Sequence, residues 1–289
     1  MFFFALSITF YLLQNFSNKH FSNTVKKSST AITLVQNGIC VLFSALSMVA
    51  INGIKVMPPK LILLSFLFGV FYLLTVFLLL KAFSLGSMGN STLLCNIGMF
   101  ISAFYGIIRF KDEFTVYIAI GTVLLLCAVI LSVPRHENGK KGGVKWFVIA
   151  LLSGISNGVV ASVKREAIAI YSDGVKNFLV FGFLFAFATA FIVLIIKRTN
   201  RQEALPILQK PVLVLCGVCA GIATAGANFF QMLSLKTVSS AIIYPFTSGF
   251  LTVSLWAASL LIYKETTLKF KNILAVIFCV IAIILVNIK

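Results

Sequence analysis

The chain has 289 residues, of which 60% are apolar and only 11% are charged, and its mean hydropathy is +1.06. This composition excludes an ordinary soluble domain. The net charge of +17 does not indicate a nucleic-acid-binding protein, because the lysines and arginines lie between the apolar runs, where they meet headgroups and water. We therefore expect an all-α integral membrane protein in a lipid bilayer, with no nucleic-acid partner.

Apolar runs long enough to cross a bilayer, which takes about 20 helical residues, recur along the chain. The first run lacks the basic start and small-residue cleavage site of a signal peptide, so we expect it to be retained as a helix. Ten spans are predicted, at about residues 1–16, 31–52, 61–80, 85–108, 114–133, 146–163, 177–196, 211–235, 238–263 and 272–288.

The last quarter of the chain repeats the plan of an earlier stretch. With an offset of 153 positions, the turn 110–112 (Phe-Lys-Asp) aligns with the turn 263–265 (Tyr-Lys-Glu). Residues 134–145 form the most polar segment and are the natural linker. The predicted organisation is a five-helix repeat at 1–133, this linker, and a second five-helix repeat at 146–289.

Five spans per repeat is an odd number, so the second repeat enters the membrane from the opposite side. Inverted repeats of this kind are typical of secondary transporters, whose substrate site lies near the midplane where the repeats meet. The count therefore predicts alternating access around a central site.

The repeated turns resemble those of the drug/metabolite transporter superfamily, in its ten-helix EamA-type members. In the first copy Asp112, Thr115 and Gly121 have the spacing of the family's acid, threonine and glycine. In the second copy Glu265 keeps the acid, but Ala275 stands one residue late in place of the glycine. The resemblance implies a multi-pass protein of the inner or plasma membrane that exports small metabolites through a central cavity.

Reactive groups at depth are not visible in the sequence. The acids and both histidines lie at span ends or in loops, so neither an enzyme nor a metal or cofactor site is expected. Lys164 and other cations also fall at predicted span ends, where they can reach headgroups. A neutral, zwitterionic or aromatic solute is therefore favoured over an anionic one. Cys216 and Cys219 form a C-x-x-C motif without further ligands, which we interpret as buried apolar packing.

Uncharged polar side chains inside the spans carry the functional prediction. Amides and hydroxyls are costly when they face lipid, so they should face partner helices or a cavity. Hydrogen bonding between helices is the plainer alternative for each of them. The predicted substrate-binding residues are Gln14, Asn15, Tyr72, Asn96, Asn157, Asn228, Gln231, Tyr244 and Ser248.

Proline and glycine supply the predicted moving parts and close contacts. Pro245 deletes a backbone hydrogen bond within its span and is predicted to act as a hinge. The pairs Gly154/Gly158 and Gly217/Gly221 should let helices approach closely. The sequence thus predicts a monomeric transporter of a small solute such as an amino acid. The alternative is a membrane bundle that transports nothing and handles lipid or serves as a scaffold.

Overall fold

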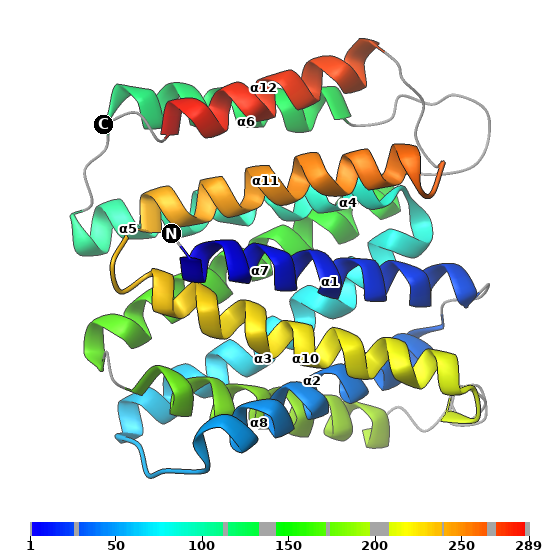
Figure 1. Ribbon diagram of the computed structural model, residues 1–289, viewed down its shortest axis with the longest axis vertical. Helices are drawn as coiled ribbons and strands as arrows, with labels where there is room; N and C mark the ends of the chain where they lie inside the picture. Colours follow the sequence, from blue (N-terminus) through cyan, green and yellow to red (C-terminus); the bar gives the residue numbers. More distant parts are fainter. Residues whose placement is uncertain are drawn as a thin grey trace. The chain divides into compact units, whose positions relative to one another are not determined.

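In the computed structural model, the described residues are 2–25, 29–111, 115–132, 143–171, 174–196, 208–238, 240–264 and 270–286, and they form α-helices without any strand. The helices are shown in Figure 1. Their bounds are α1 Phe2–Thr24, α2 Thr30–Asn52, α3 Pro59–Leu85, α4 Met88–Cys95, α5 Gly98–Phe110, α6 Val116–Ser132, α7 Val144–Ile170, α8 Val175–Ile196, α10 Pro211–Ser234, α11 Ser240–Leu261 and α12 Phe270–Val286.

Local sequence signals explain several helix ends. The Ser29 side chain accepts a hydrogen bond from the Ile32 N–H at 3.3 Å and so caps the start of α2. Gly53 ends the same helix with a positive φ of 67°, a conformation that costs glycine little. Pro211 opens α10, at a position where its missing N–H would have no helical partner.

Seven of the described helical segments are long and apolar enough to cross a membrane, so the chain is a multi-pass membrane protein. They are α2, α3, α7, α8, α10, residues 88–110 across α4 and α5, and residues 242–261 of α11. α6 and α12 have 17 residues each. α1 carries several polar side chains and also falls outside this set. The predicted number of ten spans therefore remains a prediction.

The fourth predicted span, residues 85–108, is not one continuous helix. The backbone breaks into α4 and α5 at Asn96 and Ile97. At the break the Ile97 N–H bonds to the Leu94 carbonyl at 3.2 Å and the Phe100 N–H to the Ile97 carbonyl at 3.0 Å, the tighter three-residue spacing. Residues 88–110 still form one candidate membrane span, as predicted, but the structure divides this span into two helices, a break that the sequence did not predict.

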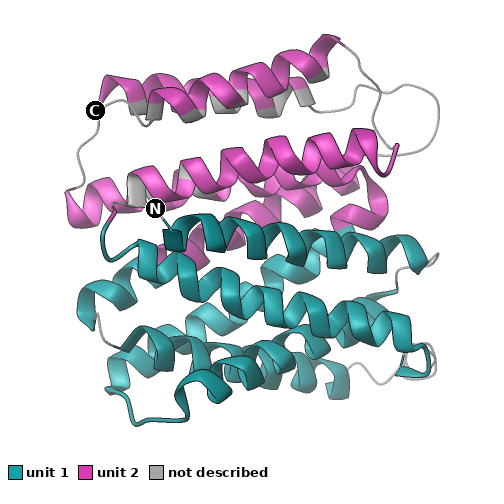
Figure 2. Ribbon diagram, in the orientation of Figure 1, with its two compact units in different colours: residues 1–81, 163–237 teal, residues 82–162, 238–289 magenta. Residues whose placement is uncertain are grey.

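The chain folds into two compact units, coloured separately in Figure 2. Unit 1 contains residues 1–81 and 163–237, and unit 2 contains residues 82–162 and 238–289. Each predicted repeat therefore contributes to both units. The boundaries fall inside α3 and α7, so these two helices each have residues in both.

Unit 1 is built on α10. This helix runs beside α1 and also packs against α2, while α2 packs against α8 (Figure 1). The glycines of α10 permit this approach, because a Cβ on Gly221 would lie 2.5 Å from the Cys40 carbonyl oxygen and 2.8 Å from the Phe43 Cβ. Gly217 likewise meets Ile39 of α2. The predicted close contact at Gly217 and Gly221 is confirmed.

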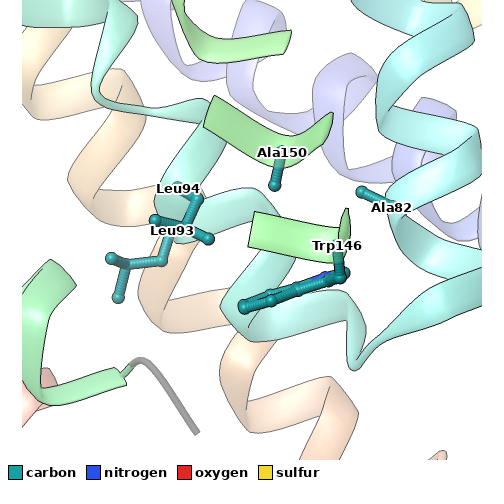
Figure 3. Close-up of a cluster of buried hydrophobic side chains, with 5 residues drawn as sticks. All are labelled: Ala82, Leu93, Leu94, Trp146 and Ala150. Atoms are coloured by element: carbon teal, nitrogen blue, oxygen red, sulfur yellow. The ribbon is translucent and has the colours of Figure 1, made fainter. Parts of the chain in front are cut away.

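Unit 2 is organised around α11, which packs against α4, α5 and α12, while α12 pairs with α6 (Figure 1). Its apolar cluster joins Leu93 and Leu94 of α4 to Trp146 and Ala150 of α7, with Ala82 beside them (Figure 3). The Trp146 indole N–H is satisfied within this cluster, because it donates to the hydroxyl of Ser91 at 2.8 Å.

The glycines of α7 pack directly on the break between α4 and α5. A Cβ on Gly154 would lie 2.7 Å from the Leu94 carbonyl oxygen and 2.9 Å from that of Cys95. A Cβ on Gly158 would lie 2.6 Å from the carbonyl oxygen of Gly98. The predicted close approach at Gly154 and Gly158 is confirmed. The backbone of α7 packs directly against the backbone at the break between α4 and α5 and so stabilises the broken helix.

Two lysines have a left-handed backbone, which is uncommon outside glycine. They are Lys111 with φ 55° and Lys264 with φ 50°, the described non-glycine residues with positive φ. These two positions are 153 residues apart, the offset that aligns the two repeated turns in the sequence. The acids that follow, Asp112 and Glu265, lie outside the described residues.

Candidate functional site

A hydrogen-bonded polar network lies among the otherwise apolar helices of unit 1. The Tyr72 hydroxyl on α3 is its centre: it accepts a hydrogen bond from the Gln14 amide at 2.9 Å and donates to the Thr224 hydroxyl at 3.1 Å. Thr224 also lies 3.7 Å from the Cys40 sulfur of α2. The network thus links α1, α2, α3 and α10, and it satisfies side chains that are at most 6% exposed.

The network continues along α10 to a buried lysine. Thr224, Asn228 and Gln231 follow one another at helical spacing, and the Asn228 amide donates to the Thr224 carbonyl at 2.9 Å. From α7, the Lys164 ammonium donates to the Asn228 side-chain oxygen at 3.1 Å and to that of Gln231. The Tyr11 hydroxyl of α1 donates to the same Gln231 oxygen at 2.8 Å.

Lys164 corrects the sequence-based prediction. It was expected at the end of a span with its ammonium in the headgroup region, but α7 continues to Ile170 and the lysine is only 3% exposed. Lys19 lies beyond the first predicted span, at about residues 1–16, but the structure places it in α1, where it is 1% exposed. The two lysines are 145 positions apart, the offset that also aligns Ala5 with Ala150 in the sequence.

Aromatic rings surround the Tyr72 end of the network. The Phe68 ring stacks on Tyr72 with centroids 5.5 Å apart, and the Phe183 ring meets Tyr72 edge-on at the same distance. Phe178 packs edge-on against Phe68. The network therefore has a polar, charged end at Lys164 and an aromatic wall at Tyr72, both within unit 1.

A second buried polar stripe in unit 1 was not predicted from the sequence. It lies on α2 at helical spacing, and each member is at most 1% exposed; the members are Thr33, Gln36, Asn37, Cys40 and Ser44. The amide atoms of Gln36 and Asn37 have no hydrogen-bond partner. Their spacing of three and four residues along an apolar span could have predicted a buried polar face on this helix, since buried amides are costly without partners.

The four remaining predicted residues lie in unit 2. The Asn96 amide, at the break between α4 and α5, donates to the Ser248 carbonyl at 2.9 Å and to the Thr252 hydroxyl at 2.6 Å. The Tyr244 hydroxyl donates to the Ala161 carbonyl at 2.8 Å. Asn157 is half-buried on α7. These contacts fasten α11 to α4 and α7.

The nine predicted residues are therefore divided between the two units. In unit 1, Gln14 bonds directly to Tyr72, while Asn228 and Gln231 share Lys164; Asn15 is buried but donates to the Tyr11 carbonyl of its own helix at 2.8 Å. In unit 2, the contacts of Asn96 and Tyr244 go to backbone or neighbouring hydroxyls and fit interhelical bonding. α11 continues through Pro245, but its side chain lies outside the described residues.

The arrangement in unit 1 suits recognition of a polar solute rather than covalent chemistry. Among the residues described, no group of three or more histidine, cysteine or acidic side chains could hold a metal ion. The network combines hydroxyls, amides and one ammonium, which can donate and accept hydrogen bonds. Cys219 is exposed on α10, so the interpretation of both cysteines of the C-x-x-C motif as buried is wrong for this residue.

Comparison with known proteins gives information on the fold alone. No protein-family model matches the chain, and no curated protein matches it. A solved crystal structure is similar to it with a TM-score of 0.68 and 13% sequence identity, covering 98% of this chain and 96% of the other. The likeness extends over nearly the full length of both chains.

Proposed function

We propose that the protein is a secondary transporter that moves a small zwitterionic or aromatic metabolite, such as an amino acid, by alternating access. The observation that carries the proposal is the hydrogen-bonded network of unit 1, in which Tyr72, Thr224 and Lys164 lie buried among apolar helices. A helix that only fills a membrane gains nothing from a buried ammonium, because burial of a charge is costly. Intramembrane ionisable groups are typical of substrate or ion pathways.

The broken helix at Asn96 supports the proposal. Irregular backbone at membrane depth is costly unless it is enclosed by protein or lines a cavity, and discontinuous helices are typical of transporter sites. The break is enclosed by the Gly154 side of α7 and by α11, to which Asn96 bonds. A bundle with only a scaffold role has no need for such a break.

Two further features favour ten helices in two inverted repeats, as in the drug/metabolite transporter superfamily. In the predicted repeats, α2 corresponds to α8 and α6 corresponds to α12, and these equivalent helices pack against each other within their units. Elements related by a two-fold axis meet at that axis, as in an isologous contact. Lys111 and Lys264 also share the left-handed backbone at equivalent positions.

Part of the earlier argument for a neutral solute no longer holds. It depended on the lack of a cation at depth, whereas Lys164 is buried. The argument against covalent chemistry is unchanged, so we retain the proposal of a transporter, of inner- or plasma-membrane location, over an enzyme. Export as the physiological direction is implied by the resemblance stated for the sequence.

The experiment is uptake into liposomes that contain the purified protein, with radiolabelled amino acids outside and the unlabelled mixture inside. We expect uptake above that of empty liposomes, and loss of it in Tyr72→Phe, which removes the hydroxyl that links Gln14 to Thr224. Tyr117→Phe is the matched control, because Tyr117 is exposed on α6. Absence of uptake by monodisperse wild-type protein, with amino acids, nucleosides and sugars alike, would favour the scaffold bundle.

A further inference from the structure

Among the described residues, the polar contacts of Lys164 include no acidic side chain. Its ammonium donates to the side-chain oxygens of Asn228, at 3.1 Å, and of Gln231, and it lies 3.5 Å from the Tyr11 hydroxyl oxygen. All three oxygens are neutral. Glu166, the nearest acid in the chain, is not among these contacts and lies two residues away on the same helix, where side chains point in different directions.

Burial makes this imbalance costly. An ionised group withdrawn from water loses several kcal/mol of solvation, and neutral dipoles return only part of it. A buried cation is usually paired with an anion for this reason. Lys164 is 3% exposed, so solvent water supplies little of the missing solvation.

One of the three donors of the ammonium makes only a weak contact. An ammonium carries three N–H donors. Two of them reach Asn228 and Gln231, while the third direction has only the Tyr11 oxygen at 3.5 Å, beyond the range of a good N–H···O bond. The Tyr11 hydroxyl donates its own proton to the Gln231 oxygen. It therefore has no second proton to donate beside the Lys164 ammonium unless its bond to Gln231 breaks.

We propose that Lys164 binds the carboxylate of the transported solute, with Asn228 and Gln231 holding the ammonium in place and the carboxylate occupying its third donor position. The inference rests on the proposed function and narrows its substrate class to monocarboxylates, zwitterionic amino acids included. A carboxylate gives the charge-assisted hydrogen bond and the counter-charge that the described contacts of Lys164 lack.

One cation selects for one negative charge. Doubly charged phosphate would leave a buried excess of negative charge at a site whose other contacts are neutral oxygens. A cationic amine would meet the ammonium directly and be repelled. The site thus discriminates by the charge of the group that reaches Lys164.

The test uses thermal unfolding of the purified full-length protein in detergent with two pairs of probes, butyrate against butyramide and phenylacetate against phenylacetamide. Each pair differs only in carboxylate against amide, and inorganic phosphate is measured beside them. We expect both carboxylates to raise the unfolding temperature of the wild type, with no effect of the amides or phosphate. In Lys164→Gln the apparent carboxylate affinity should fall at least about 30-fold, the range for loss of one partner of a buried charge pair.

A second variant tests the missing charge itself. Gln231→Glu keeps the shape of the side chain but places a carboxylate against the Lys164 ammonium. We expect it to unfold at a higher temperature than the wild type and to lose the response to butyrate and phenylacetate. Asn23→Asp is the matched control, because Asn23 is exposed on α1 of the same unit; it should keep the wild-type response.

The outcomes separate this inference from the proposed function. The inference is overturned when the amides stabilise the protein as much as the carboxylates, when no carboxylate does, or when Lys164→Gln and Gln231→Glu both keep the response. Liposomes that still take up neutral solutes in that case leave the transporter proposal intact. If carboxylates selectively stabilise the protein but liposomes show no uptake, the proposed binding site is supported and the transporter proposal is rejected.

Discussion

The contact of α5 with α7 in unit 2 gives a prediction that can be worked out from the backbone. An alanine Cβ at position 98 would overlap the Gly154 carbonyl oxygen and lie 2.6 Å from the Gly158 nitrogen. Both atoms belong to the main chain, so no change of rotamer relieves the overlap. Gly98→Ala therefore requires α5 and α7 to separate beside the break at Asn96.

The magnitude follows from two opposing terms. Overpacking of a closely packed contact costs typically about 1–3 kcal/mol, while replacing glycine by alanine in a helix gains at most about 1 kcal/mol. Because the overlap is with main-chain atoms, the overpacking cost lies toward its upper limit, and the difference of the two terms is a destabilisation of about 2 kcal/mol for Gly98→Ala. Gly38→Ala is the matched control: Gly38 lies inside α2 with nothing within 4 Å of an added Cβ, so alanine there should stabilise.

The measurement is chemical unfolding of the two variants and the wild type in the same detergent. The expected order of denaturation midpoints is Gly38→Ala above wild type and Gly98→Ala below it. A Gly98→Ala midpoint equal to or above that of the wild type would refute the close backbone contact. Equal losses in both variants would show that glycine is needed for helix flexibility rather than for the approach of α7.

Two further predictions concern α11. Asn96→Ala removes two hydrogen bonds to α11, but the Thr252 hydroxyl still donates to the Ser248 carbonyl at 2.8 Å. We therefore expect the free energy of unfolding to fall by only about 1–2 kcal/mol in the same assay. A loss no larger than in an exposed asparagine variant would contradict a structural role for these bonds. Pro245→Ala restores a backbone N–H to α11 and should slow uptake in liposomes while leaving phenylacetate stabilisation unchanged; an unchanged uptake rate would remove Pro245 from the mechanism.

The sequence by itself determined the class of protein. Composition and the length of the apolar runs are sums over many residues, so they indicate membrane helices whatever the packing. The glycine pairs were also predictable, since 154 and 158, or 217 and 221, fall on one face of a helix by its periodicity alone. The structure confirms both close contacts.

The break of the fourth span was decided by tertiary contacts. Residues 94–98 (Leu-Cys-Asn-Ile-Gly) contain no proline, and their glycine comes after the break. The irregular turn is stabilised by neighbours distant in sequence: α7 packs on the carbonyls of Leu94 and Cys95, and Asn96 bonds to α11. Local propensity cannot encode contacts supplied by other helices.

Lys164 shows the same limit for the candidate site. In sequence it closes an apolar run and stands beside Arg165, which is typical of a lysine at the membrane surface. Its burial depends on where α7 ends and on the amides that α10 brings to it, Asn228 and Gln231, more than 60 residues away in the chain. The sequence identified these amides as polar groups at depth. Only the tertiary structure placed an ammonium between them, because burial is a property of the packed helices and not of the span.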